Sequence, residues 1–330
     1  ETVVSPEMMA EFDSINKRGA VFRMEDSGTK EEQAFLLFSV NCWTMAIAGR
    51  KKIFLEHPYI ESINGYGHED YALNIELAGA DIPHLVAPGA IYFVRRKKMS
   101  RQKWNDAEHN TQPRSALFDF EFWKKMKTDE KLSKVGLREF YTKLQGNRLI
   151  RGVMKPAGKI AKRMLTKTSS DLPASLLSEW RKVAEIEPVA MPDKLKMNTL
   201  GLGGVNKCCP ASVVYQEICR DMPEKLDTVA VVTKLNSPDE LKNKIGDEKE
   251  GRILVLTTKR QKTIEWPENV TWVDMEQYLK KLASEQAETL VTRLLVQTGA
   301  KIIIEPNGYG ARWLKEHEKL AKTLEVKVAE

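Results

Sequence analysis

The sequence contains few cysteines and no long apolar run. Its four cysteines form no Cys-x-x-Cys pair and have no histidine near them, which argues against a zinc site and favours free thiols in a reducing cytoplasm. No stretch of eighteen apolar residues occurs, so we expect no membrane-spanning helix. The first residues lack a basic start followed by an apolar core, and therefore do not resemble a signal peptide.

The charge is positive overall and unevenly spread. Lysine and arginine number 52 against 46 aspartates and glutamates, which gives a net charge of +6. Much of the excess lies in two basic segments, 93–104 and 148–167. Such segments suit contact with nucleic acid, acidic lipid or phosphate-bearing ligands, and they also suit a solvated basic face.

Residues 1–125 are predicted to form a mixed α/β unit. One predicted helix covers 5–17 and begins with a Ser cap followed by Pro, and a second covers 69–80 with acidic residues in its first turn. Short apolar runs bounded by polar residues or glycine predict extended structure. These runs are 19–24, 35–40 and 85–94, the last being two pieces around a Pro-Gly break.

The remaining chain is predicted to contain a basic helical linker, 126–225, and a parallel α/β module, 226–330. The linker includes one helix within 168–188 that a proline ends. In the C-terminal module, continuous apolar strands alternate with helices, which predicts a parallel sheet covered on both faces. The predicted strands are 227–235, 251–259, 269–275 and 300–306, and the predicted helices are 237–245, 276–299 and 310–324. The fold class is therefore α/β, and residues 325–330 are predicted to begin a further strand.

Residues 63–73, INGYGHEDYAL, place two glycines directly before Glu69 and Asp70 at the start of a predicted helix. The free N–H groups and positive dipole of a helix N-terminus stabilise an ionised carboxylate, by up to about 1 kcal/mol when it is exposed. Glycines before it allow a bulky ligand to approach the backbone. Such a carboxylate can accept a proton from an attacking hydroxyl, although the same residues also suit an ordinary capped helix.

This stretch resembles the Gly-aromatic-Gly-x-Glu-Asp motif near the end of the catalytic domain of inverting GT-A (family 2-like) glycosyltransferases. The preceding residues follow that family's order, with a strand, a small-residue turn, an AI-x-x-R element (AIAGR, 46–50) and an aromatic residue. The resemblance covers about residues 1–125. It implies inverting transfer of a sugar from a nucleotide-sugar donor to a saccharide or other hydroxyl-bearing acceptor.

The resemblance also implies roles for individual residues. Asp70 would be the general base that deprotonates the acceptor hydroxyl, and Glu69 would bind or orient that hydroxyl. Gly65 and Gly67 would let the acceptor approach. The further substrate-binding residues that it implies are Tyr66, His68, Asn41, Trp43, Arg50, Arg95 and Arg96.

Two features depart from the family pattern. The chain has no Asp-x-Asp, the motif that normally holds a divalent metal and the donor diphosphate. Because the opening ETVVSPEMMAEF resembles the segment after that motif, we expect the donor half to precede residue 1 or to come from another subunit, and the chain alone to be inactive. Where relatives place a metal-binding histidine, 91–100 has none, so the Mn²⁺ or Mg²⁺ that the resemblance implies has no identified ligands. The cations of Arg95–Lys98 can instead neutralise a diphosphate.

A second resemblance concerns residues 288–324, ETLVTRLLVQTGAKIIIEPNGYGARWLKEHEKLAKTL. They resemble part of the N-terminal Rossmann-type half of GT-B glycosyltransferases. The resemblance implies a ligand loop at the carboxyl end of the strand 300–306, where α/β sheets bind ligands. That loop would be lined by Glu305, Asn307, Gly308 and Gly310. Gly-Tyr-Gly after a strand also serves as a plain connecting turn.

Two classes of function follow from these patterns. The first class, which the two resemblances imply, is a glycosyltransferase, or a piece of a larger one, with two transferase-like modules in tandem. Alternatively, the chain is a non-catalytic binding module for nucleic acid or a phosphate-rich polymer, a reading that the absent Asp-x-Asp favours. The basic segments are not interleaved with aromatic residues, which weakens the nucleic-acid version of this alternative.

Overall fold

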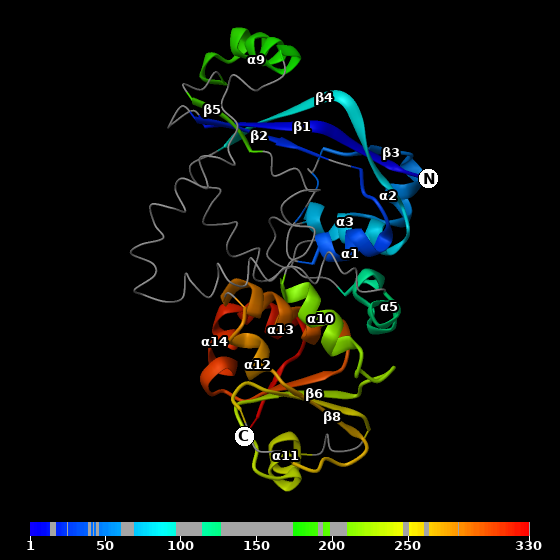
Figure 1. Cartoon of the computed structure of the whole chain (residues 1–330), viewed down its shortest axis with the longest axis vertical. Coiled ribbons are helices and arrows are strands. Elements are labelled where there is room, and N and C mark those ends of the chain that lie inside the picture. Colours follow the sequence, from blue (N-terminus) through cyan, green and yellow to red (C-terminus); the bar gives the residue numbers. More distant parts are fainter. Residues whose placement is uncertain are drawn as a thin grey trace.

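The computed structural model contains two five-stranded sheets with layers of helices between and outside them (Figure 1). It describes residues 1–13, 18–24, 26–38, 41, 43, 46–60, 69–96, 114–126, 174–190, 194–198, 210–246, 251–260, 264–282 and 284–329. Figure 1 shows α9 at one end, then a mixed sheet, two helical layers, a parallel sheet and finally α11. Within the described ranges, no helix has both the length and the apolar character needed to cross a membrane.

The first sheet is mixed and is built around β1. Strand β1 pairs antiparallel with β2 and β3 and parallel with β4, while β2 pairs parallel with β5. The strands are β1 (Val3–Asp13), β2 (Arg18–Arg23), β3 (Ala48–Gly49), β4 (His84–Arg96) and β5 (Lys194–Asn198).

Helices cover the mixed sheet at two separate places. Near the start of β1, Val3 packs with Ile53 of α2 and Leu73 of α3. Toward the other end of β1, α9 packs on the sheet through Leu176 and Trp180. The helices of this half are α1 (Lys30–Leu36), α2 (Lys51–Glu56), α3 (Glu69–Gly79), η1 (Ala116–Phe118), α5 (Phe120–Lys125), α9 (Ala174–Ile186) and η3 (Pro188–Ala190).

The second sheet is wholly parallel, as predicted, with strand order β10-β9-β6-β7-β8. The order reverses between β6 and β9, so the carboxyl ends of these two strands form a topological switch point. Its strands are β6 (Thr228–Val232), β7 (Ile253–Thr257), β8 (Val270–Asp274), β9 (Lys301–Ile304) and β10 (Lys327–Val328). Its helices are α10 (Pro210–Cys219), α11 (Pro238–Ile245), α12 (Glu276–Leu279), α13 (Ser284–Thr298), α14 (Gly308–Glu316) and α15 (Glu318–Thr323).

One large apolar core joins the two halves of the molecule. It contains side chains of α1, α3 and α5 together with side chains of α10, α13 and the parallel sheet. Helix α10 contacts both α5 and α13, and its Tyr215 hydroxyl donates a hydrogen bond of 2.6 Å to the carbonyl of Phe118. Gln216 likewise donates to the carbonyl of Met126 at 2.9 Å. The divisions expected at 125/126 and 225/226 stay predictions, and packing contacts cross both of them.

The helix predicted over 5–17 is wrong, because residues 3–13 form β1. The register of β1 against β4 shifts between Pro6 and Met8, so the alternation of buried side chains changes phase there. The buried side chains are Val3 and Ser5 before the shift and Met8, Ala10 and Phe12 after it. The shift hides the period of two that identifies a strand, and Ser-Pro-Glu imitates the start of a helix.

The strand predicted over 35–40 is also wrong, since its first residues end α1. The signal that identifies this helix lies upstream. Thr29 accepts a hydrogen bond from the main-chain N–H of Glu32, whose side chain accepts one from the N–H of Thr29, so the pair forms a capping box. The pieces predicted within 85–94 belong to one strand, β4, whose pairing is irregular at the predicted Pro-Gly break.

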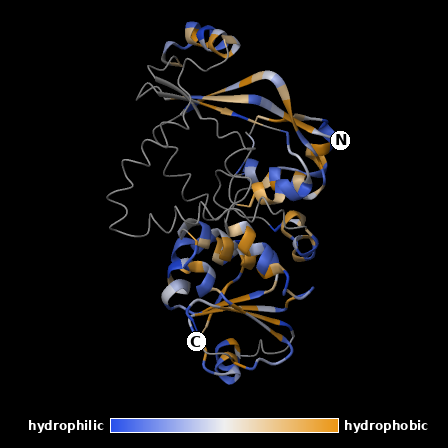
Figure 2. Ribbon diagram, viewed as in Figure 1, coloured by the Kyte–Doolittle hydropathy of each residue, from blue (hydrophilic) through white to orange (hydrophobic). Residues whose placement is uncertain are grey.

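Most other predicted elements are confirmed. Helix α3 begins at Glu69, and α9 ends at Ile186, directly before Glu187 and Pro188. The helix predicted over 276–299 is two helices, α12 and α13, and the one over 310–324 is broken at His317 into α14 and α15. In Figure 2 the strands of the parallel sheet are orange over most of their length, whereas the mixed sheet changes colour along its strands.

Candidate functional site

The first candidate site lies at the N-terminus of α3, where hydrogen bonds from described residues hold the Asp70 carboxylate. Its Oδ1 accepts from the main-chain N–H of Tyr71, and its Oδ2 accepts from Nδ2 of Asn41, each at 2.9 Å. The Oδ1 of Asn41 in turn accepts from Nδ2 of Asn74, one turn further along α3, at 2.8 Å. Asn41 therefore bridges two positions of the helix and fixes the orientation of the Asp70 carboxylate.

Glu69 contributes a second, partly buried carboxylate beside Asp70. Its Oε2 is buried, and no donor among the described residues reaches it. A buried acceptor oxygen without a donor costs about 1–3 kcal/mol. This oxygen is therefore suited to receive a hydrogen bond from a hydroxyl that enters the site.

Trp43 supports the same site from the side of the mixed sheet. Its ring stacks on that of His84, with centroids 4.3 Å apart and planes within 8°. The Nε2 of His84 lies 2.6 Å from Oγ of Ser5, and burial lowers the pKa of His84 to about 3, so the ring is neutral. The N–H of Trp43 donates to Oδ1 of Asn41 at 3.5 Å. Trp43 therefore connects His84 of β4, which contacts Ser5 of β1, to Asn41, the residue that holds Asp70.

Tyr59 is a candidate that the sequence reading missed. Its side chain is 43% exposed, and its pKa is raised by burial and by the nearby charges of Asp70 and Glu69. An exposed aromatic ring beside two carboxylates can pack against the apolar face of a bound sugar. The signal that would have indicated it is an aromatic residue ten positions before the Glu-Asp pair.

The predicted arginines do not gather at this site. Arg50 is exposed and precedes the first turn of α2. Arg95 forms an ion pair of 3.4 Å with Glu187, near the end of α9. Since Arg95 is eleven residues after His84 on β4, it lies about 35 Å along the strand from the ring that stacks on Trp43. Arg96 follows at the same end of β4. The predicted residues Gly65, Tyr66, Gly67 and His68 lie outside the described residues, as do 148–167 and most of 93–104.

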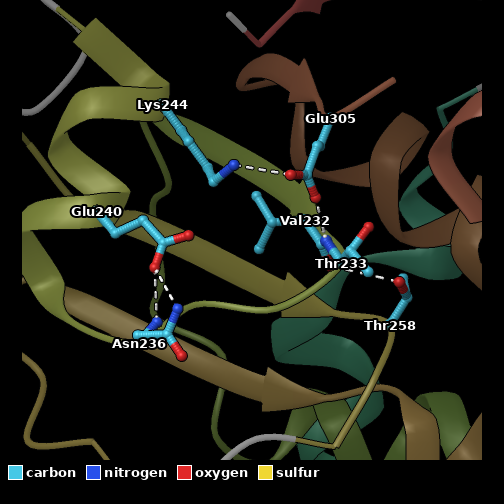
Figure 3. A network of polar contacts seen from close by, with 7 residues as sticks. All are labelled: Val232, Thr233, Asn236, Glu240, Lys244, Thr258 and Glu305. Atoms are coloured by element: carbon cyan, nitrogen blue, oxygen red, sulfur yellow. Dashed lines mark hydrogen bonds and ion pairs between the residues drawn. The ribbon is translucent and has the colours of Figure 1, made fainter. Parts of the chain in front are cut away.

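The second candidate site lies at the switch point of the parallel sheet, where Glu305 follows β9 (Figure 3). Its Oε2 accepts from the main-chain N–H of Thr233, which follows β6, at 2.5 Å. Its Oε1 pairs with Nζ of Lys244 on α11 at 2.7 Å. Burial alone would raise the pKa of Glu305, but the hydrogen bonds from Lys244 and Thr233 outweigh it and lower the pKa. Glu305 is thus ionised between the ends of the two central strands.

The predicted loop residues Asn307, Gly308 and Gly310 continue from Glu305 into α14. Asn307 is the exposed N-cap residue, and Gly308 has the left-handed φ of +53°. A Cβ on Gly310 would overlap the carbonyl oxygen of Glu305 and approach Cγ2 of Ile304 to 2.8 Å, so only glycine fits. The glycines bring the N-terminus of α14 against the end of β9. This places a carboxylate, an ammonium group and free main-chain N–H groups at one edge of the sheet.

Within the ranges that the structure describes, no three His, Cys, Asp or Glu side chains form a group that could hold a metal ion. Comparisons of the chain with protein-family models, with curated proteins and with solved structures give no match. The geometry of the two candidate sites is therefore the basis for any statement about function.

Proposed function

We propose that the N-terminal half of the chain is the acceptor side of an inverting glycosyltransferase, with Asp70 as its general base. The hydrogen bond between Asn41 and Asp70 carries this proposal. The resemblance implies that Asp70 is the general base and that Asn41 binds substrate. Although 29 positions separate them in sequence, they meet at the N-terminus of α3. The mixed sheet would then be the acceptor part of a GT-A-like domain.

The proposed chemistry uses the two carboxylates in different ways. The acceptor hydroxyl would donate a hydrogen bond to Glu69, whose buried Oε2 meets no donor among the described residues. Asp70 would take the proton of that hydroxyl as its oxygen attacks the anomeric carbon of the donor. The bond from that carbon to the nucleoside diphosphate would break, and the diphosphate would leave with the electron pair. Attack from the opposite face gives inversion.

The hydrogen bonds at Asp70 suit a base. Donors from Asn41 and from the main chain of Tyr71 orient the carboxylate without neutralising it. The N-terminus of α3 favours its ionised form. Mn²⁺ or Mg²⁺ is a cofactor of the resembled family, and the described residues contain no group of three His, Cys, Asp or Glu side chains that could hold it.

We further propose that the parallel module is Rossmann-like, related to part of a GT-B glycosyltransferase, and that its switch point holds a ligand. The ionised Glu305 could accept hydrogen bonds from ligand hydroxyls, and the loop from Asn307 to Gly310 would line the site. We place the protein in the cytoplasm because of its cysteine usage.

The proposal is tested by replacing Asp70→Asn in the intact protein. Release of nucleoside diphosphate from a panel of nucleotide sugars, with saccharides as acceptors, should fall on the order of 10²–10⁴-fold because the base is lost. Glu76→Gln is the matched control. Glu76 is also a carboxylate on α3, but it contacts His57 and not Asn41. Its activity should be close to that of the unaltered protein, and circular dichroism should be the same for all three proteins.

Full activity of the Asp70→Asn protein would contradict the assignment of the base. Titration with DNA at two salt concentrations separates the alternative class of function. Tight binding that weakens steeply with salt, together with no binding of nucleotide sugars, would replace the proposal with a non-catalytic binding module.

A further inference from the structure

Helix α13 of the parallel module turns two buried polar side chains toward the other half of the molecule. Arg293 is fully buried, and its guanidinium carbon lies 3.9 Å from the centroid of the Phe118 ring. One turn later, Oε1 of Gln297 accepts a hydrogen bond of 3.2 Å from the main-chain N–H of Ser115. The Ser115 hydroxyl reaches the carbonyl of Ile75, on α3. Polar contacts therefore run from α13 to the helix that carries Asp70.

The contact of Arg293 with Tyr71 reaches the candidate site directly. The Tyr71 hydroxyl is close enough to the buried Arg293 guanidinium to raise its pKa, which partly offsets the lowering by burial. That hydroxyl donates in turn to the carbonyl of Leu37 at 2.5 Å. Leu37 is the C-cap residue of α1 and precedes Asn41 by four positions. The main-chain N–H of the same Tyr71 donates to Asp70. Tyr71 therefore contacts both the Asp70 carboxylate and Leu37, which precedes Asn41 in the sequence.

The burial of Arg293 is not explained by stability alone. Removing a guanidinium from water costs free energy, and an apolar side chain of similar volume often serves at least as well in a core. Burial lowers the pKa of Arg293, and the nearby Tyr71 and Tyr215 hydroxyls partly offset this. A side chain on α13 that is costly to bury and that lies beside residues of three other elements, α3, η1 and α10, is suited to specify one arrangement of those elements.

We propose that Arg293 is a positioning residue for the Asp70 carboxylate. It fixes the Tyr71 hydroxyl, and Tyr71 fixes the start of α3 and the segment that delivers Asn41. The parallel module therefore sets the geometry of the carboxylate in the other half of the molecule, and the first site is incomplete without the second module. The catalytic consequence rests on the proposed function, whereas the positioning itself does not.

The test uses Arg293→Met, which keeps much of the volume and removes the charge, in the full chain labelled with ¹⁵N-tyrosine. Tyr71→Phe, which removes the bridging hydroxyl, gives a second variant, and Asp70→Asn marks the Tyr71 amide signal through its hydrogen bond. In Arg293→Met we expect that signal to move. In the intact protein, which includes the donor half, kcat for transfer should fall on the order of 10- to 100-fold, as small misplacements of a catalytic group cause. The midpoint of thermal unfolding should stay the same or rise.

Two comparisons make the outcome decisive. Arg312→Met is the matched control, because Arg312 also lies over an aromatic ring, that of Tyr309 at 5.0 Å, but on α14, outside the contacts that lead to α3. Its Tyr71 signal and kcat should not change. In the double variant, Arg293→Met should add little to the loss of kcat that Tyr71→Phe causes, because both changes remove the same link.

An unmoved Tyr71 signal in Arg293→Met would overturn the positioning role, and so would effects of Arg293→Met and Tyr71→Phe that simply add. A Tyr71 signal that moves in Arg293→Met, while Asp70→Asn leaves transfer by the intact protein at full activity, would support positioning and contradict the proposed function.

Discussion

The mixed sheet and the parallel sheet bury their strands in different ways. Every residue of β6 and of β7 is buried, and the side chains on one face of the parallel sheet belong to the large core that also contains α1 and α3. Along β1 of the mixed sheet, buried and partly exposed side chains alternate, and the alternation changes phase between Pro6 and Met8. The buried apolar side chains of β1 fall into two separate clusters, Val3 in one and Met8, Ala10 and Phe12 in the other.

This difference has a consequence for cooperativity. The cluster beneath α9 is small among the described residues and contains Met8, Ala10, Phe12, Val21, Leu176, Trp180 and Ala190. The parallel sheet shares its core with helices from both halves of the chain. We therefore expect the α9 end of the mixed sheet to open locally, and the parallel sheet to unfold together with the rest of the molecule.

The largest effects should come from removing one buried tryptophan in each half. Trp180 on α9 donates to the carbonyl of Ala190 at 2.6 Å, and Trp313 on α14 donates to Oγ1 of Thr292 at 2.9 Å, so the two residues are matched. Either Trp→Ala change should cost about 3–5 kcal/mol of local packing. Trp313→Ala should lower the whole unfolding transition, whereas Trp180→Ala should release α9.

Hydrogen exchange distinguishes these two results. In Trp180→Ala, the amides of α9 and β5 should lose protection while those of β6 and α13 keep it. Equal loss of protection across both sheets in Trp180→Ala would show that the two halves have a single cooperative core, and the contrast between them would then be wrong.

A smaller effect is expected from glycine replacements in the two halves of the molecule, one on α14 beside the parallel sheet and one on β4 of the mixed sheet. In Gly310→Ala the new Cβ would overlap the main chain of Glu305, which should cost about 3 kcal/mol as overpacking. In Gly89→Ala, on β4, the Cβ would meet no described atom within 4 Å, so only the left-handed φ of +76° opposes it, at about 1–2 kcal/mol. Urea unfolding measures both. A larger loss for Gly89→Ala would contradict the view that close packing is concentrated in the parallel half.

The same contrast explains which parts of the fold could be predicted. Strands buried on both faces are continuous apolar runs, so all four strands predicted in the parallel module and their parallel pairing are confirmed. The period of two in β1 is interrupted by the shift at Pro6, and the residues around it imitate a capped helix. The apolar residues at the end of α1 led to the wrong prediction of a strand over 35–40, although Thr29 and Glu32 form a capping box that indicates a helix.

The candidate sites were predictable to different degrees. The position of Asp70 at a helix N-terminus followed from its place before an apolar helical run, and α3 begins as expected. The stack of Trp43 on His84 could not be predicted, because it depends on the parallel pairing of β1 with β4, which are far apart in sequence. The same holds for Lys244 and Glu305, which meet only because α11 and β9 flank the carboxyl end of β6.

The smallest expected effect concerns His84 of the mixed sheet and the dependence of the free energy of unfolding on pH. Burial lowers the pKa of His84 to about 3, whereas an unfolded histidine titrates near 6.5. Above pH 6.5 neither state binds this proton. Between pH 6.5 and 3 the unfolded state binds it and the folded state does not, so stability falls as the pH falls. By pH 5 the loss should be roughly 2 kcal/mol, at about 1.4 kcal/mol for each pH unit.

Replacing His84→Gln should remove this part of the acid dependence, because glutamine can still reach the Ser5 hydroxyl but does not titrate. His57→Gln, which alters a histidine at the surface end of α2, is the control and should leave the dependence in place. Urea unfolding at pH 7 and pH 5 gives the two free energies for each protein. The His84 ring stacks on Trp43 at the candidate site. If the free energy of unfolding fell equally between pH 7 and pH 5 in the unaltered and His84→Gln proteins, the His84 ring would be solvated and the mixed sheet would be open there. The Asn41–Asp70 contact would then lack the support that the stacked rings give it.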